Sequence, residues 1–312
     1  MVKREEFSYD SRDMISSIHA FRWVPQDMEI RFIVQIIHGK TESLERYNEF
    51  ATFLAQKGIL VVGNDHLGHG TTAAKSEDKG YFCKNDGATV LVRDVHRLKK
   101  MTQEQYPGKQ YFIIGHSMGS YILRNYLCRY GTGIDGAIIC GTGSRNQFQV
   151  KAEKALITIL MWLKGDHAIS KMIEHMAFSS FNRRIDHRRT DADWLSKDQE
   201  VVDQYCNNEQ YQYTFTLNGY KVLADLIDNS QSKRYLVNMP KELPILFASG
   251  TEDPVGNYGK GVRKAYHLFE QIGMKQISLK LYEGDRHEIL NETDRAVVYE
   301  DFLNWIESHV TK

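Results

Sequence analysis

The chain has few cysteines, no excess of charge of either sign and no long apolar run, and each feature excludes a class of protein. Its 312 residues include four cysteines, which lie far apart without C-x-x-C spacing, so we expect free thiols rather than disulfides. Forty basic and forty acidic residues cancel, which leaves no overall field to attract nucleic acid or an anionic membrane. No run approaches the roughly 18 apolar residues of a membrane span.

The opening residues and the histidines exclude two further classes. The charged start at residues 1–6 is not followed by the apolar stretch of a secretory signal, so we expect a cytoplasmic protein. Among the twelve histidines, His66 and His69 are close, but Gly68 and Gly70 make their segment a tight loop rather than a helix that presents both rings. We therefore expect no metal site.

The most informative feature that is present is the pentapeptide G-x-S-x-G at residues 115–119. It follows the apolar run 111–114 and precedes a segment with helical character at 120–127, which is the context of a nucleophile elbow. In that turn the serine hydroxyl is exposed between a strand and a helix, and the flanking positions have no room for side chains. Ser117 is therefore the candidate nucleophile.

An acid and a histidine follow the serine in the order that α/β hydrolases use. The apolar run 244–248 ends in a loop that carries Asp253, the candidate orienting acid. A helical stretch, a strand and a turn then lead to His287, the candidate base. One helix plus one strand fits a crossover between parallel neighbours, so acid and base should end adjacent strands. Asp285 is a rival acid, less favoured because it would have to fold back onto a histidine in its own loop.

An oxyanion hole would complete such a site, since two backbone N–H groups must face the oxygen that becomes negative. The residue after the nucleophile, Met118, is expected to provide one of them. The loop after the apolar run 32–37 is expected to provide the other, and we assign it to Lys40. A backbone donor does not depend on its side chain, although the Lys40 ammonium would favour an anionic substrate if it does not simply extend into water.

The order of predicted elements indicates a mostly parallel twisted sheet with helices on both faces. We expect an opening hairpin at 7–9 and 14–23, strands at 32–37, 59–64, 110–115, 134–140, 245–249 and 277–282, and helices at 44–57, 87–106, 118–130, 258–272 and 293–309. The alternation stops between 141 and 243. We therefore predict a core formed by residues 1–140 and 244–312 and an inserted, mainly helical cap at 141–243.

With these motifs, the chain resembles the α/β hydrolases of the monoacylglycerol lipase and bacterial lysophospholipase group, which also contains serine aminopeptidase-like proteins. The resemblance covers nearly the whole chain. It rests on His38-Gly39 with Arg46-Tyr47, residues 65–70, the elbow at 115–119, residues 193–196, the loop around Asp253 and residues 286–292. It implies a triad of Ser117, Asp253 and His287, an oxyanion hole of Lys40 and Met118, and no cofactor. Many relatives have a small or apolar residue in place of Lys40, and a Glu-His pair in place of Glu42-Ser43.

We therefore expect a serine hydrolase that cleaves esters of lipid-like substrates, of monoacylglycerol or lysophospholipid type, through an acyl-enzyme. A serine aminopeptidase or amidase with the same triad is one alternative, and a non-catalytic binding protein with this fold is another. The apolar segment 155–163 either packs on the core or lines an acyl pocket that includes Trp162. We expect small-molecule esters or lipids as partners, with no nucleic acid and at most peripheral membrane contact.

Overall fold

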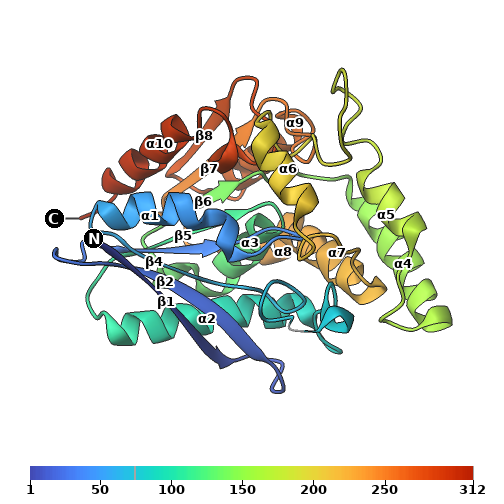
Figure 1. The fold of residues 1–312 in the computed structure, drawn as a ribbon, viewed down its shortest axis with the longest axis horizontal. Helices are drawn as coiled ribbons and strands as arrows, with labels where there is room; N and C mark the ends of the chain where they lie inside the picture. Colours follow the sequence, from blue (N-terminus) through green and yellow to red (C-terminus); the bar gives the residue numbers. More distant parts are fainter. Residues whose placement is uncertain (74, 312) are drawn as a thin grey trace.

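A single twisted sheet organises the molecule (Figure 1). The computed structural model describes residues 1–73 and 75–311, and its eight strands follow the order β1-β2-β4-β3-β5-β6-β7-β8. The strands are β1 (Val2–Asp10), β2 (Ser17–Pro25), β3 (Ile33–Ile37), β4 (Leu60–Asn64), β5 (Tyr111–His116), β6 (Gly136–Cys140), β7 (Ile245–Gly250) and β8 (Ile277–Tyr282).

The predicted fold class is confirmed by this sheet. Strands β4, β3, β5, β6, β7 and β8 pair in parallel, whereas β1 and β2 form an antiparallel hairpin at one edge, and β2 runs antiparallel to β4. Every residue of β3 to β7 is buried, as expected for parallel strands that are covered on both faces. The strand order reverses between β3 and β5, and the crevice at such a switch point is where ligands bind in open α/β sheets.

Helices cover both faces of the sheet. One face packs against α2 (Gly87–Gln105), α3 (Met118–Tyr130) and α9 (Lys260–Gln271), and the other packs against α1 (Asn48–Gln56) and α10 (Arg295–Glu307). Helix α9 shows why these segments form helices on the sheet: Val262, Ala265 and Phe269 recur every three or four residues and are fully buried, while the opposite side is polar. Such a stripe stabilises the helix through burial rather than through intrinsic propensity.

The segment between β6 and β7 adds helices but no strand to the sheet. It contains α4 (Gln147–Lys164), α5 (Lys171–Phe178), α6 (Gln199–Asn207), α7 (Leu217–Gln231) and the short α8 (Lys233–Leu236). Figure 1 shows α4 and α5 at one side of the molecule, away from the sheet. Helix α7 packs on both α3 and α4, so it connects the outer helices of this segment to the sheet.

A buried arginine ties both ends of the inserted segment to α3. Arg124 is fully buried, and its guanidinium donates to the Gly143 carbonyl at 2.9 Å and to the Ser230 carbonyl at 2.8 Å. Burial lowers the pKa of Arg124 to about 10, yet the side chain stays charged at neutral pH. A charged donor strengthens both hydrogen bonds, so the chain is fixed where it leaves the sheet and again shortly before it returns.

None of the helices within 1–73 and 75–311 combines the length and the apolar character that a bilayer crossing requires. The same residues contain no group of three or more side chains arranged to hold a metal ion.

Candidate active site

The elbow holds Ser117 in a strained backbone conformation between β5 and α3. Its φ of 52° and ψ of −119° lie in a region that side-chain-bearing residues rarely adopt. Two glycines make the turn possible, because a Cβ on Gly119 would collide with the carbonyl oxygen of Ile37, and a Cβ on Gly115 would collide with that of Gly119. The crowding predicted for this turn is thus present, and Ser117 starts the helix at the point where the strand order reverses.

The loop after β3 lies directly against the elbow. A Cβ built on Gly39 would lie 3.0 Å from the Cβ of Ser117, so the backbone of residues 38–40 passes close to the serine. Met118 is the first residue of α3, and the N–H groups of a helix's first turn have no partner within the helix. The two segments expected to provide oxyanion donors therefore flank Ser117.

Asp253 and His287 form a buried pair at the ends of adjacent strands. Asp253 follows β7, His287 follows β8, and Oδ1 of the acid lies 3.0 Å from Nδ1 of the histidine. The carboxylate also accepts hydrogen bonds from the Val255 N–H at 2.8 Å and the Ser249 hydroxyl at 3.0 Å. Burial raises the pKa of Asp253, but His287 and these hydrogen bonds outweigh it, so the pKa lies below its usual value. The acid is thus an anion that faces the histidine ring.

The rival acid does not face the histidine. Asp285 is buried, and its carboxylate pairs with the ammonium of Lys197 at 2.7 Å. Burial raises the pKa of Asp285, and Lys197 only partly offsets this effect. Of the two candidates, the structure brings Asp253 and not Asp285 to His287.

The Lys40 side chain lies among aromatic rings of the inserted segment. Its Nζ is 4.5 Å from the ring centroid of Phe178, 4.7 Å from that of Phe215 and 5.8 Å from that of Tyr220. Such contacts attract a cation, but burial still lowers the pKa of Lys40 to about 8. The side chain therefore does not simply extend into water, because its ammonium packs against rings of the inserted segment.

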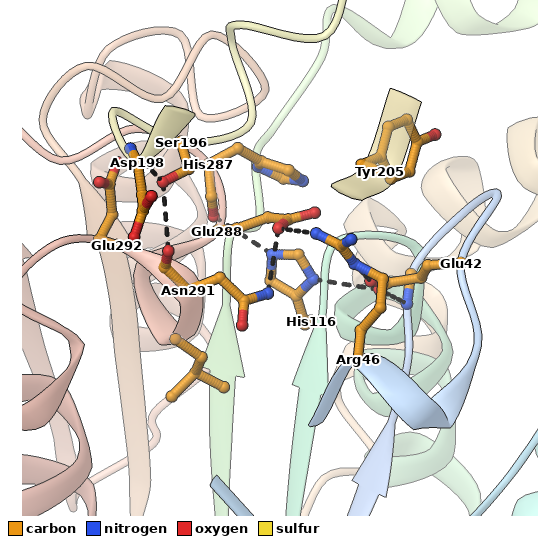
Figure 2. Close-up of polar contacts among 12 residues, drawn as sticks. Glu42, Arg46, His116, Ser196, Asp198, Tyr205, His287, Glu288, Asn291 and Glu292 are labelled. Carbon is orange, nitrogen blue, oxygen red and sulfur yellow. Dashed lines mark hydrogen bonds and ion pairs between the residues drawn. The ribbon is translucent and has the colours of Figure 1, made fainter. Parts of the chain in front are cut away.

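The sequence did not reveal a buried ionic network next to His287, which Figure 2 shows. His116 Nδ1 is 2.9 Å from the Tyr47 hydroxyl, which donates to Glu42 at 2.8 Å, and His116 Nε2 is 3.2 Å from the His287 carbonyl oxygen. With the Tyr47 hydroxyl donating to Glu42, both ring nitrogens of His116 face acceptors, which favours an imidazolium. Burial opposes charge on both groups, but Glu42 raises the pKa of His116, and His116 holds the pKa of Glu42 at about 2.

This network joins the loop after β3 to the loop that carries the histidine. Glu42 accepts a hydrogen bond from the Gly39 N–H, so one carboxylate fixes the backbone beside Ser117 while its imidazolium partner fixes the backbone of His287. Arg46 extends the network, because it pairs with both Glu42 and Glu288 and lies 5.1 Å from the ring centroid of Tyr205 on α6. The only signal in the sequence was that these ionisable residues lie within a few positions of the candidate site residues.

The inserted segment contacts the histidine through residues 193–196 and leaves Trp162 outside. The Trp194 ring centroid is 5.0 Å from that of His287, and the Leu195 carbonyl accepts from the Glu288 N–H at 2.8 Å. Ser196 donates to the Asn291 carbonyl at 3.2 Å (Figure 2). Trp162, in contrast, is 84% exposed, so in this conformation its indole lies on the outer surface of α4 and not beside Ser117.

Comparison with known proteins agrees with this geometry. Residues 28–294 match the family model described as serine aminopeptidase, S33. The chain belongs to this family. It is 27% identical to a monoacylglycerol lipase of Mycolicibacterium smegmatis over 92% of each chain, and 26% identical to the monoglyceride lipase of Rattus norvegicus over 92% of this chain and 86% of that one.

A crystal structure of a thermostable carboxyl esterase from Bacillus coagulans superposes on this member of the family with a TM-score of 0.92, at 29% identity and full coverage of both chains. The monoglyceride lipase of Saccharomyces cerevisiae, with a TM-score of 0.76 and 20% identity over 99% of this chain and 96% of that chain, shares the fold.

Proposed function

We propose that this protein hydrolyses carboxylic esters of lipid-like substrates, of monoacylglycerol or lysophospholipid type, with Ser117 as nucleophile, His287 as base and Asp253 as orienting acid. The observation that carries the proposal is the buried Asp253–His287 pair, which ends two strands of the sheet that also presents the strained Ser117. A nucleophile, a base and an acid that orients the base are the parts that acyl transfer needs.

The reaction would proceed in two halves. Ser117 Oγ attacks the ester carbonyl while His287 takes its proton, and the carboxylate of Asp253 stabilises the imidazolium that forms. The N–H groups of Lys40 and Met118 would stabilise the oxyanion. The alcohol leaves with the proton from His287, and an acyl-enzyme on Ser117 remains. Water then attacks that ester with His287 again as base, which releases the carboxylic acid and restores the serine.

A lipid-like substrate is supported by the inserted segment as well as by the relatives. We interpret residues 141–243 as a cap over a core of residues 1–140 and 244–312. The outer surfaces of α4 and α5 expose large apolar side chains, among them Trp162, Leu163 and Met176, at 84%, 62% and 55%. An apolar patch of this kind suits contact with lipid aggregates. The curated relatives named as monoacylglycerol or monoglyceride lipases point to the same class of substrate.

An aminopeptidase is less well supported, although the family description includes that activity. Such an enzyme must bind the free α-ammonium of its substrate, for which a carboxylate near the nucleophile is the natural partner. The carboxylates beside the elbow, Glu42 and Asp253, are each already paired with a histidine. The Lys40 ammonium of the adjoining loop would repel a cationic substrate. A binding protein without activity would have no need of the strained serine beside an acid–histidine pair.

Replacement of the nucleophile tests the proposal. Ser117→Ala should lower the hydrolysis of p-nitrophenyl octanoate by at least about 10⁴-fold and abolish covalent labelling by a fluorophosphonate, with an unchanged melting temperature. Ser8→Ala, at an exposed position of β1, is the matched control. A panel of monoacylglycerols, lysophospholipids and aminoacyl amides then identifies the substrate class. Retention of more than about a hundredth of the activity, or amides as the best substrates, would contradict the proposal.

A further inference from the structure

A large groove lies where the inserted segment joins the sheet domain, and the proposed reaction does not use it. Its volume is about 1230 Å³, and its walls are the residues around the start of α4, the end of α7 with α8, and one side of α9. Pockets for small molecules usually measure roughly 300–1,000 Å³, so this groove is large enough for a ligand of that size. None of Ser117, Asp253 and His287 lines it.

The lining of the groove is strongly basic in a chain with no net charge. Its one carboxylate, Asp228, is already paired with Lys154 at 2.7 Å. Arg145 is paired with Glu153 at 2.8 Å, and the other lysines and arginines of the lining have no ion pair among residues 1–73 and 75–311. The basic lining residues are Arg145, Lys151, Lys233, Arg234, Lys260, Arg263 and Lys264. Concentration of like charge in a concave surface raises the local concentration of anions.

Helix α9 contributes one complete side to this basic surface. Lys260, Arg263, Lys264, His267 and Gln271 line the groove, and their spacing of three or four residues places them on one face. This face begins at the N-terminus of a 12-residue helix, where the helix dipole also favours an anion. Like charges at such spacings destabilise an isolated helix. A bound anion would offset this repulsion between the basic side chains.

Two buried polar groups lie at the groove without a partner. Gln231 is 5% exposed, and its Oε1 accepts a hydrogen bond from the Arg145 N–H at 2.7 Å. This bond identifies the other amide atom as the nitrogen, and that Nε2 has no hydrogen-bond partner among the described residues, nor has the hydroxyl of Ser144. A buried donor without an acceptor costs about 1–3 kcal/mol, and both residues line the groove. Both donors therefore lie at the wall of the groove and have no protein acceptor.

We propose that this groove is a binding site for a soluble, multiply phosphorylated small molecule. Several unpaired cations match several phosphate charges, and the neutral donors of Gln231 and Ser144 match additional phosphate oxygens. A flat membrane surface could not fill a concave site. The lining contains a single tyrosine, Tyr235, whereas single-stranded nucleic acid is typically bound by several stacked aromatic residues. The proposal is independent of the function of Ser117.

Titration of the full chain with inorganic tripolyphosphate, followed by calorimetry, tests this site directly. We expect each chain to bind one tripolyphosphate saturably at low salt. Binding should be weaker at 0.3 M salt, because ions screen exposed charges. The double variant Arg263→Gln, Lys264→Gln should weaken binding at least tenfold and leave ester hydrolysis unchanged. The double variant Lys84→Gln, Lys100→Gln, at exposed positions outside the groove, makes a comparable change in net charge and should bind as the parent protein does.

Gln231→Met should weaken tripolyphosphate binding about fivefold without loss of the folded state, as checked by thermal melting.

Further ligands distinguish the possible sources of phosphate. Phosphatidylcholine vesicles with and without a phosphoinositide, and a single-stranded RNA of about 20 nucleotides, are titrated in parallel. The proposal is overturned if tripolyphosphate at 1 mM shows no saturable binding, if both double variants lose affinity equally, or if the vesicles or the RNA bind more tightly than tripolyphosphate.

Discussion

Exchange of Asp253 for asparagine would remove one charge and preserve the shape of the site. The Asp253 carboxylate accepts from His287 and from the Val255 N–H through Oδ1, and from the Ser249 hydroxyl through Oδ2. In Asp253→Asn, the amide oxygen should take the Oδ1 position, because two N–H groups point there, and the new NH₂ can donate to Ser249. The histidine would then keep its proton on Nδ1 and remain able to accept the serine proton.

The expected loss of activity therefore comes from the missing charge. In the transition state, the imidazolium would no longer face an anion. Two unit charges about 4 Å apart, at an effective dielectric constant of about 20, attract each other by about 4 kcal/mol. At about 1.4 kcal/mol for each factor of ten, kcat should fall about 10³-fold. If the amide turned the other way, the histidine tautomer would be wrong, and the loss would approach about 10⁴-fold.

Asp285→Asn is the matched control, because it makes the same change in a buried acid two residues from His287. Asp285 faces Lys197 and not the histidine, so kcat for p-nitrophenyl octanoate should stay within about threefold of the parent enzyme. Steady-state kinetics of both variants, with melting temperatures to confirm folding, decide the question. A larger loss for Asp285→Asn than for Asp253→Asn, or a loss below tenfold for Asp253→Asn, would refute the assignment of the acid.

Two further predictions concern buried charges near the elbow. The pKa of Glu42 is lowered to about 2 and that of His116 is raised, so their pair contributes most between about pH 4.5 and 6.5 and is lost above the raised pKa of His116. Glu42→Gln should lower the free energy of unfolding by about 3 kcal/mol at pH 6 and by less at pH 9, and equal losses in urea unfolding at both values would contradict a charged pair. Because burial lowers the pKa of Lys40 from 10.5 to about 8, Lys40→Met should stabilise the protein by on the order of 2 kcal/mol at pH 7, and this gain should shrink between pH 8 and 10.5. A gain that does not change with pH in thermal melts would exclude a destabilising ammonium.

The sequence predicted the elements of the sheet domain well because their signals are local. Helix α3 spans the predicted residues 118–130, and β8 spans the predicted 277–282. The opening hairpin was predicted too short, since β1 begins at Val2 and not at Phe7. Its first residues are charged and mostly exposed, so no apolar alternation marks them. They are held by pairing with β2, where Glu5 lies opposite Arg22, and that pairing depends on a partner elsewhere in the chain.

The site was predictable only where motifs encode it. Ser117, Asp253 and His287 follow a recognisable order, and the structure brings the last two into contact. The network of Glu42, His116 and Glu288 was not predicted, because its members are separated by 74 positions or more. They acquire their partners only when the end of β5 and the loops after β3 and β8 meet at one edge of the sheet. The surroundings of Lys40 were missed for the same reason, since its aromatic neighbours come from two helices and a connecting stretch of the segment without regular alternation.

The hydrogen bonds of Arg124 indicate how the inserted segment of this protein could be replaced by that of a relative. The same helix that begins at the serine also holds both junctions of the inserted segment through one guanidinium. These two bonds are made to backbone carbonyls, which any sequence provides, and a longer third one goes to the Thr142 hydroxyl at 3.3 Å. Arg124 therefore constrains the path of the chain more than its composition. A segment of different length or sequence could therefore be grafted into this scaffold if it places one backbone carbonyl at each of the two positions where Arg124 donates. A graft that misplaces either contact would leave part of the buried guanidinium without an acceptor, at a cost of several kcal/mol.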